Sequence, residues 1–180
     1  MKRLFFGIPA AKDTHQAIVH LTQELKHLKG TEHVKWVAPR NYHVTLHFLG
    51  PTPADKIPAL IDAINQIKPN GPVELIWKKI LPFPKSHPFA LVIYAQLTES
   101  LAKLTQQICT TSETLTLPGR KHAYLPHLTL GRDRKHLIHL DTKNFKVTLP
   151  EKQLVTEFVL YESELTPNGS IYTVLEKFEL

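Results

Sequence analysis

A short pattern of residues occurs twice in this chain, and no other feature restricts its fold as strongly. It consists of His, an aliphatic residue, Thr and Leu, at residues 43–46 and again at residues 127–130. Side chains two positions apart project from the same face of a β-strand. Each copy therefore predicts a strand with a polar pair on one face and aliphatic residues on its core face. The two pairs are His43 with Thr45 and His127 with Thr129.

The spacing of the pattern indicates two similar halves, since both His and Thr recur after 84 positions. Helices are predicted where apolar residues recur every three or four positions, and strands where apolar runs end at Gly or Pro. The expected helices span residues 10–28, 54–68 and 99–114, the last of them capped by Thr98. Besides the two motif strands, strands are expected at residues 3–9, 34–37, 73–81, 89–96, 145–149, 154–165 and 171–178.

Strands and helices mix in a β-α-β-like order about once per half, which predicts an α+β fold. We expect two antiparallel sheets with helices packed outside, and one His/Thr pair from each half facing a shared cleft. Residues 1–180 are expected to form a single domain of two small lobes, because domains commonly contain roughly 100–200 residues.

Charge and cysteine content narrow the classes of function. A formal net charge of +6 and a pI near 9.4 favour an anionic partner such as nucleic acid or phosphate. The single cysteine, Cys109, excludes an internal disulfide, and thiolate-rich zinc patterns are absent from the sequence. No apolar run approaches the ~20 residues that span a bilayer. We therefore expect a cytoplasmic protein with no membrane association.

The paired His-x-Thr motifs resemble the signature of the 2H phosphoesterase family. Residues 4–9, 43–50, 126–132 and 161–165 look like the bacterial and archaeal RNA 2′,3′-cyclic phosphodiesterase branch, formerly called 2′-5′ RNA ligase. The resemblance spans nearly the whole chain and is weakest at residues 71–88. It implies a bilobal α+β fold with two pseudo-symmetric halves and a central cleft between them.

The two histidines suit the hydrolysis of a 2′,3′-cyclic phosphate. Water must lose a proton as it attacks phosphorus, the departing ribose oxygen must gain one, and two imidazoles can do both near neutral pH. The threonine hydroxyls are placed to donate hydrogen bonds to the phosphate oxygens, so no metal or other cofactor is required. The resemblance implies that His43 is the general acid, that His127 is the general base, and that the product is a 2′-phosphomonoester.

Several further residues are candidates for the site. Arg132 fits the family's His-x-Thr-x-x-Arg extension and would support the phosphate, although strict alternation turns it away unless the strand bends at Gly131. Alternation also places His47 on the face of His43, where it either contacts the ligand or serves as a solvated or core histidine. Four aromatic residues are candidates either to stack a base or to pack in the core: Tyr42, Phe83, Tyr124 and Tyr172. Of these, Tyr124 and Phe83 are the base-stacking candidates for the site. Other basic candidates for the cleft are Arg120, Lys121 and Arg134.

Two other interpretations compete with hydrolysis. One is a binding module that holds nucleotides or RNA ends without turning them over. The other is a metal hydrolase that uses residues such as His43 and His47, although the rise over four strand positions places them about 13 Å apart, too far to bind one ion directly. Within the enzyme hypothesis the partner is RNA with a 2′,3′-cyclic phosphate, tRNA fragments, a small cyclic nucleotide, or a 2′-5′ linkage made by reverse ligation. We expect a monomer with no obligate protein partner.

Overall fold

The computed structural model describes residues 1–68, 71–84, 86–120, 122–133, 135, 138, 148–167 and 169–180. The strands in this part of the chain are β1 (Lys2–Pro9), β2 (Lys35–Trp36), β3 (His43–Thr52), β4 (Val73–Phe83), β5 (Ala90–Gln96), β6 (His127–Arg132), β7 (Lys152–Val155), β8 (Glu157–Thr166) and β9 (Gly169–Glu179). The helices are α1 (Lys12–Leu25), α2 (Ile57–Ile64) and α3 (Glu99–Thr114), with 3₁₀ turns η1 (Pro39–Asn41) and η2 (Ala54–Lys56).

Most helices and strands lie where the hydrophobic pattern predicts them. Thr98 caps α3 as expected, because its hydroxyl oxygen accepts a hydrogen bond from the backbone N–H of Leu101 at 3.3 Å. α2 is shorter than the predicted helix at 54–68, since the chain first forms η2 and the α-helix begins only with proline in its first turn. The strand predicted at 145–149 is not tested, because residues 145–147 lie outside the described residues and positions 148 and 149 belong to no strand.

The strands form one antiparallel sheet in the order β7-β4-β5-β6-β3-β1-β8-β9, and β2 pairs with β6 beside β3. The predicted α+β class and antiparallel pairing are thereby confirmed. The structure differs from the expectation in one respect, since the two expected sheets are joined edge to edge. The order is also symmetric about the junction, because β1, β8 and β9 follow β3 outward just as β5, β4 and β7 follow β6.

The pairing of β3 with β6 joins the two halves of the sheet. Val44 of β3 and Leu128 of β6 are direct antiparallel partners, and each is the middle residue of its His-x-Thr motif. Both side chains are fully buried in the hydrophobic core. The core therefore holds the two motif strands in this register, because a slip of one residue in either strand would turn its aliphatic side chain to the opposite face.

The chain crosses between the halves near its C-terminal end. The strand predicted at 154–165 is in fact two strands, since β7 pairs with β4 in one half and β8 pairs with β1 in the other. The buried side chain of Gln153 on β7 connects them further. Its Nε2 donates to the carbonyl of Pro9 and its Oε1 accepts from the N–H of Ala11, both at 3.0 Å. β7 thus fixes the start of α1.

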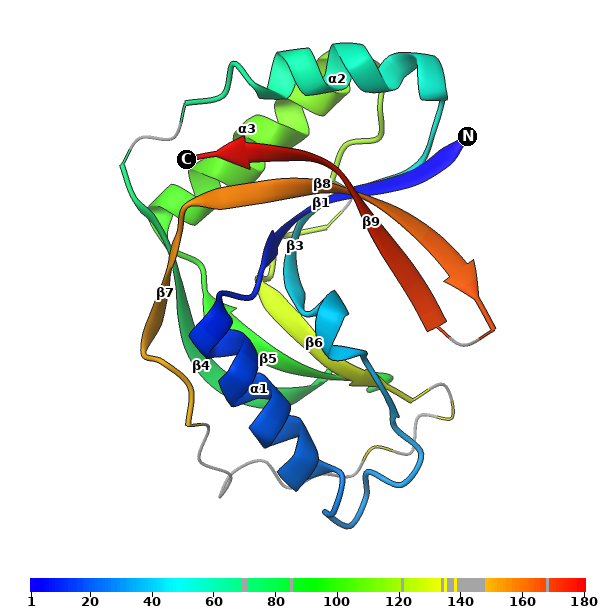
Figure 1. The fold of residues 1–180 in the computed structure, drawn as a ribbon, viewed down its shortest axis with the longest axis vertical. Helices are drawn as coiled ribbons and strands as arrows, with labels where there is room; N and C mark the ends of the chain where they lie inside the picture. The colour runs from blue at the N-terminus through cyan, green and yellow to red at the C-terminus, as the bar shows by residue number, and fades with distance from the viewer. Residues whose placement is uncertain are drawn as a thin grey trace.

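The helices cover the apolar face of the sheet. Figure 1 shows α2 and α3 at one end of the molecule, with both termini, and α1 toward the opposite end. α3 contacts α2, β3 and β4. The buried apolar residues of the helices and of the alternate strand positions form a single cluster. The face that carries the His/Thr pairs is therefore the face that the core leaves available.

Candidate active site

The pairing of Val44 with Leu128 brings the two His-x-Thr motifs side by side. Antiparallel pairing sets each histidine opposite the threonine of the neighbouring strand. Because the two central residues point into the core, their polar neighbours project from the other face, where each is partly exposed. The four side chains brought together are His43, Thr45, His127 and Thr129.

The two histidines are diagonal neighbours across β3 and β6. Residues in this relation have their Cα atoms about 7–8 Å apart, and long side chains bridge that gap. His127 is close enough to His43 for its positive charge to lower the pKa of His43. A phosphoryl group between the two rings would present opposite sides to them. The predicted juxtaposition of His43 and His127 is confirmed.

The backbone orients both imidazoles in the same way. Nδ1 of His43 lies 2.7 Å from the carbonyl oxygen of Asn41, and Nδ1 of His127 lies 2.7 Å from that of Leu125. A carbonyl only accepts hydrogen bonds, so Nδ1 carries the proton in both rings. Nε2 is then the nitrogen of each histidine that can take up or release a proton.

The first threonine contacts its own histidine. Oγ1 of Thr45 lies 3.1 Å from Nε2 of His43. With the ring proton on Nδ1, the hydroxyl of Thr45 donates to Nε2 of His43. A phosphate oxygen that takes this hydroxyl as donor would leave Nε2 available for proton transfer.

Arg132 reaches the site because β6 contains a bulge. Thr129 pairs with Val92 and Gly131 pairs with Leu91, so the register skips Leu130. A skipped residue reverses the alternation beyond it, which returns Arg132 to the face of Thr129. The charge of Arg132 lowers the pKa of both site histidines. The predicted bend is present, one residue earlier than Gly131.

The same irregularity in β3 removes His47 from the site. In the β1–β3 register Gly7 pairs with Thr45 and Phe6 with His47, which skips Leu46. His47 is therefore on the opposite face from Thr45, buried, with Nε2 2.9 Å from the carbonyl of Pro118. The expectation that His47 shares the face of His43 is wrong, because alternation does not continue through a bulge.

Arg120 and Tyr124 hold the backbone of β3 beside the site. Nη2 of Arg120 donates to the carbonyl of Leu46, the residue that the bulge leaves unpaired, at 3.1 Å. The guanidinium lies 4.7 Å from the ring centroid of Tyr124, whose hydroxyl donates to the carbonyl of Thr45 at 3.1 Å. Arg120 therefore supports β3 instead of lining the phosphate site. Tyr124, predicted as a base-stacking residue, has one ring face covered by this arginine.

Phe83, the other base-stacking candidate, lies at the site. Its ring centroid is 5.0 Å from that of His127, with the planes at 30°. Phe83 pairs with Ala90, which in turn pairs with Arg132, so these three residues share a face of the sheet. The ring is half-buried and packs against the imidazole.

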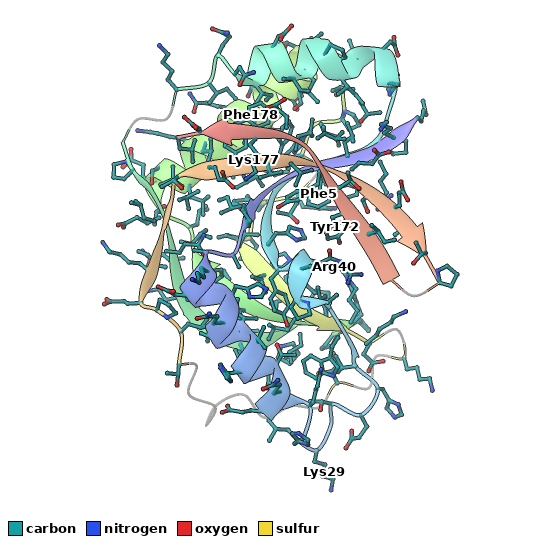
Figure 2. The ribbon with its side chains drawn as sticks, in the orientation of Figure 1. Phe5, Lys29, Arg40, Tyr172, Lys177 and Phe178 are labelled. Atoms are coloured by element: carbon teal, nitrogen blue, oxygen red, sulfur yellow. The ribbon has the colours of Figure 1, made fainter. Side chains whose placement is uncertain are left out.

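A cluster of aromatic residues surrounds His43. Phe5 is buried 4.9 Å from the imidazole centroid and 5.0 Å from both Tyr161 and Tyr172. Tyr172 stands edge-on to His43 at 5.3 Å. Figure 2 shows Phe5 and Tyr172 close together near the middle of the molecule. The sequence assigned no role to Phe5 or Tyr161, although both lie in segments that carry the family resemblance.

Gly7 provides the space for the ring of His43. A Cβ atom at position 7 would lie 3.1 Å from Cδ2 of His43, 3.2 Å from the carbonyl oxygen of Val44 and 3.4 Å from Cε2 of Phe5. These approaches are tighter than most ordinary contacts, and one of them is to backbone. Glycine at this position therefore lets β1 pass directly beside the imidazole.

Comparison with known proteins places the chain in a family. A model of the LigT like Phosphoesterase family matches residues 8–94, which include the first motif. An RNA 2′,3′-cyclic phosphodiesterase from Aquifex aeolicus is 30% identical over 187 residues, covering 99% of this chain and 97% of that relative. This chain belongs to the LigT-like phosphoesterase family.

Relatives of this LigT-like phosphoesterase extend across archaea and bacteria. An RNA 2′,3′-cyclic phosphodiesterase from Methanocaldococcus jannaschii is 28% identical over 182 residues, covering 98% of this chain and 99% of the relative. The crystal structure of E. coli LigT complexed with 3′-AMP superposes with a TM-score of 0.76 at 25% identity, covering 99% and 97% of the two chains. The predicted 2H phosphoesterase fold is confirmed over essentially the full length.

Both site histidines of the LigT-like phosphoesterase favour the neutral form. Burial lowers the pKa of His43 to about 4, and the charges of Arg132 and His127 act in the same direction against the hydrogen bond to Asn41. Burial also lowers the pKa of His127, again helped by Arg132 and opposed by the carbonyl of Leu125. A histidine that acts as a general acid in this site thus needs a nearby anion to hold its proton.

The remaining sequence predictions concern two basic residues, a metal site and membrane-spanning segments. Lys121 and Arg134, two basic candidates of this LigT-like phosphoesterase, lie outside the described residues. Within the described ranges, no three His, Cys, Asp or Glu side chains gather closely enough to hold a metal ion. In that same part of the chain, no helix combines the length and apolar character needed to cross a bilayer.

Proposed function

We propose that this protein hydrolyses RNA 2′,3′-cyclic phosphate ends to 2′-phosphomonoesters by acid–base catalysis between two histidines. The observation that carries the proposal is the Val44–Leu128 pair, which sets two His/Thr pairs in register on one sheet face. Relatives over nearly the whole chain are RNA 2′,3′-cyclic phosphodiesterases, and E. coli LigT binds 3′-AMP. Both findings support an RNA end as the substrate.

In the proposed reaction the water oxygen attacks phosphorus as the bond from phosphorus to the 3′-oxygen breaks. Nε2 of His127 takes the proton from water, and Nε2 of His43 gives its proton to the 3′-oxygen. The attacking and leaving oxygens lie roughly in line through phosphorus, which suits two imidazoles placed diagonally across the phosphate. The assignment of acid and base follows the family resemblance.

The threonines and Arg132 would stabilise the charge on the phosphoryl oxygens. Donors aimed at developing charge commonly contribute 10²–10³ in rate, by the general figure for one such donor. The monoanionic phosphate would in turn raise the pKa of His43, because an opposite charge favours the protonated imidazole. This coupling allows the general acid to be protonated only when substrate is bound.

The same groups would support the reverse ligation. A 5′-hydroxyl in place of water would lose its proton to His127 and attack phosphorus, and the bond to the 3′-oxygen would break to leave a 2′-5′ linkage. No further group is needed, because the oxygen nucleophile is the only part that changes.

A short RNA with a 2′,3′-cyclic phosphate tests the proposal. The purified protein is incubated with it after exhaustive treatment with EDTA, and the product terminus is compared with 2′- and 3′-phosphate standards. We expect a gain of one water and a 2′-phosphate end. Activity lost to EDTA and restored by zinc or manganese would support a metal hydrolase, and tight binding without any opening of the ring would support a binding module. An RNA with a 3′-phosphate serves as the unreactive control.

A further inference from the structure

Two cations face each other at the end of the site strand. Lys35 of β2 is the direct cross-strand partner of Arg132 of β6. Directly paired residues share one face of a sheet, and both side chains are exposed. Like charges in this relation destabilise a sheet. An anion bound between them would remove that cost.

The pair lies next to the proposed reaction site. Arg132 and Thr129 pair with Ala90 and Val92, which are two positions apart on β5. This places Arg132 roughly 7 Å along the strand from Thr129, by ordinary strand rise. The charge of Arg132 already acts on both site histidines. Arg132 therefore links the reacting phosphate to a second position beside Lys35.

Lys35 has no anionic partner among the described residues. Its Nζ donates to the carbonyl oxygen of Pro167, at the turn between β8 and β9, at 3.2 Å. Four other lysines of the described chain pair with glutamates, namely Lys2, Lys103, Lys152 and Lys177, and Lys56 donates to the carbonyl of Leu115. Lys35 is thus held near the site by one neutral acceptor and can exchange it for a phosphate.

The opposite side of the site has a different character. Phe48 occupies the position in β3 that Arg132 occupies in β6, 84 positions earlier. It is 44% exposed, its ring stacks with that of Phe5, and the guanidinium of Arg3 lies 4.5 Å from its ring centroid. The β3 side thus presents an aromatic ring with a guanidinium over it, and the β6 side presents two cations beside the ring of Phe83. With its cyclic phosphate at the histidines, a nucleotide would direct its further phosphate toward the two cations.

We propose that Lys35 and Arg132 form a second phosphate subsite for the 5′-phosphate of the terminal nucleotide, which is the phosphodiester that joins it to the rest of an RNA. The inference rests on the proposed function for the placement of the reacting phosphate next to His43 and His127. It adds a reason for the enzyme to prefer an RNA end over an isolated cyclic nucleoside phosphate.

Calorimetric titration with two mononucleotides tests the subsite without any turnover. Adenosine 3′-monophosphate and adenosine 3′,5′-bisphosphate differ only by the 5′-phosphate. We expect the wild-type protein to bind the bisphosphate roughly tenfold more tightly at low salt, the scale of one hydrogen bond to a charged group. The preference should shrink as salt is added, because the subsite is exposed.

Matched variants identify the residue responsible. Lys35→Ala should reduce the bisphosphate preference to below about threefold, and Lys35→Arg should retain most of it, since the charge persists. Lys29→Ala removes the same charge at the lower edge of the molecule in Figure 2, outside the Lys35–Arg132 pair, and should leave the preference unchanged. Equal affinity for the two nucleotides in wild type, or a preference that survives Lys35→Ala, overturns the subsite.

The binding test and the hydrolysis test fail independently. A Lys35-dependent preference for the bisphosphate together with intact cyclic ends would retain the subsite and reject the proposed hydrolysis. Hydrolysis of cyclic ends without a Lys35-dependent preference would support the proposed hydrolysis and reject the subsite. For an active enzyme, the ratio of kcat/KM between a dinucleotide and a mononucleotide with cyclic ends should also fall in Lys35→Ala.

Discussion

The hydroxyl of Thr45 lies 3.1 Å from Nε2 of His43, the nitrogen that the proposed reaction uses. With Nδ1 held by the carbonyl of Asn41, this hydroxyl donates to the imidazole. Phosphate binding would redirect it to a phosphoryl oxygen. The threonine would thus act both as phosphate donor and as the group that holds the ring in place.

Thr45→Ala should therefore reduce kcat by about 10²–10³, the usual cost of removing one donor to developing charge. Thr45→Ser keeps the hydroxyl and should stay within about tenfold of wild type in the same steady-state assay. Equal losses in the two variants would show that the methyl group matters more than the hydroxyl, and would contradict the donor role.

The two histidines are expected to act as one unit. His43→Ala and His127→Ala should each lower kcat by about 10²–10⁴, the range for one general acid or base. The double variant should lose less than the product of the two single losses, because groups that act in one transition state are strongly non-additive. Multiplicative losses in single-turnover rates would indicate independent roles.

The pH dependence should differ between kcat/KM and kcat. The pKa of His43, lowered to about 4 chiefly by burial, means that the ring is mainly neutral at pH 7 before substrate binds. Bound phosphate raises this pKa, so the alkaline limb of kcat should lie at higher pH than that of kcat/KM. Identical limbs would contradict the coupling between phosphate and His43.

Removing the charge of Arg132 provides an internal check on this assignment. Arg132 lowers the pKa of both histidines, so Arg132→Gln should raise both values. The upward shift should appear in the imidazole titrations followed by NMR, whether or not the variant is active. Unchanged titrations would place the guanidinium too far from the rings to act on them.

Buried histidines should also make the fold sensitive to acid. Burial lowers the pKa of His47, whose Nε2 lies at the carbonyl of Pro118. A group with a folded pKa below its unfolded value near 6.5 contributes stability above that pH and loses it as pH falls further. The urea concentration at the midpoint of unfolding should therefore decrease as the pH is lowered below about 6.5. His47→Gln should make that decline shallower, and an equally steep decline would exclude His47 as its source.

Gly7→Ala should impair catalysis without unfolding the protein. The added Cβ would lie 3.1 Å from Cδ2 of His43, so the ring must move by a few tenths of an ångström. We expect kcat to fall on the order of tenfold, because catalysis is sensitive to small displacements of reacting groups. The thermal midpoint should change by only a few degrees. Wild-type kcat would indicate that the imidazole moves freely.

The local pattern predicted a good part of the site. Alternation along a strand is a property of the backbone itself, so His43 and Thr45, like His127 and Thr129, had to share a face. The matching spacing predicted that the two pairs belong together. The prediction for His47 was wrong because a bulge at Leu46 interrupts the alternation, and an aliphatic residue gives no sign of being skipped.

The residues around the histidines depend on contacts between distant strands. Phe5 and Tyr172 are 167 positions apart in the chain, and their rings meet because β1 pairs with β8 and β8 with β9. The Lys35–Arg132 pair likewise arises only because β2 joins the free edge of β6. Neither contact leaves a periodic signal, since cross-strand neighbours need not be near in sequence.

By itself, the sequence determined that each half carries a His/Thr pair on a strand face, because side-chain direction follows from local backbone geometry. Only the tertiary structure decided that one pair, Val44 with Leu128, fuses the halves into a single sheet. It also decided that the bulge at Leu130 turns Arg132 toward the histidines. Register and bulges arise from packing of the whole core, which no short stretch of residues specifies alone.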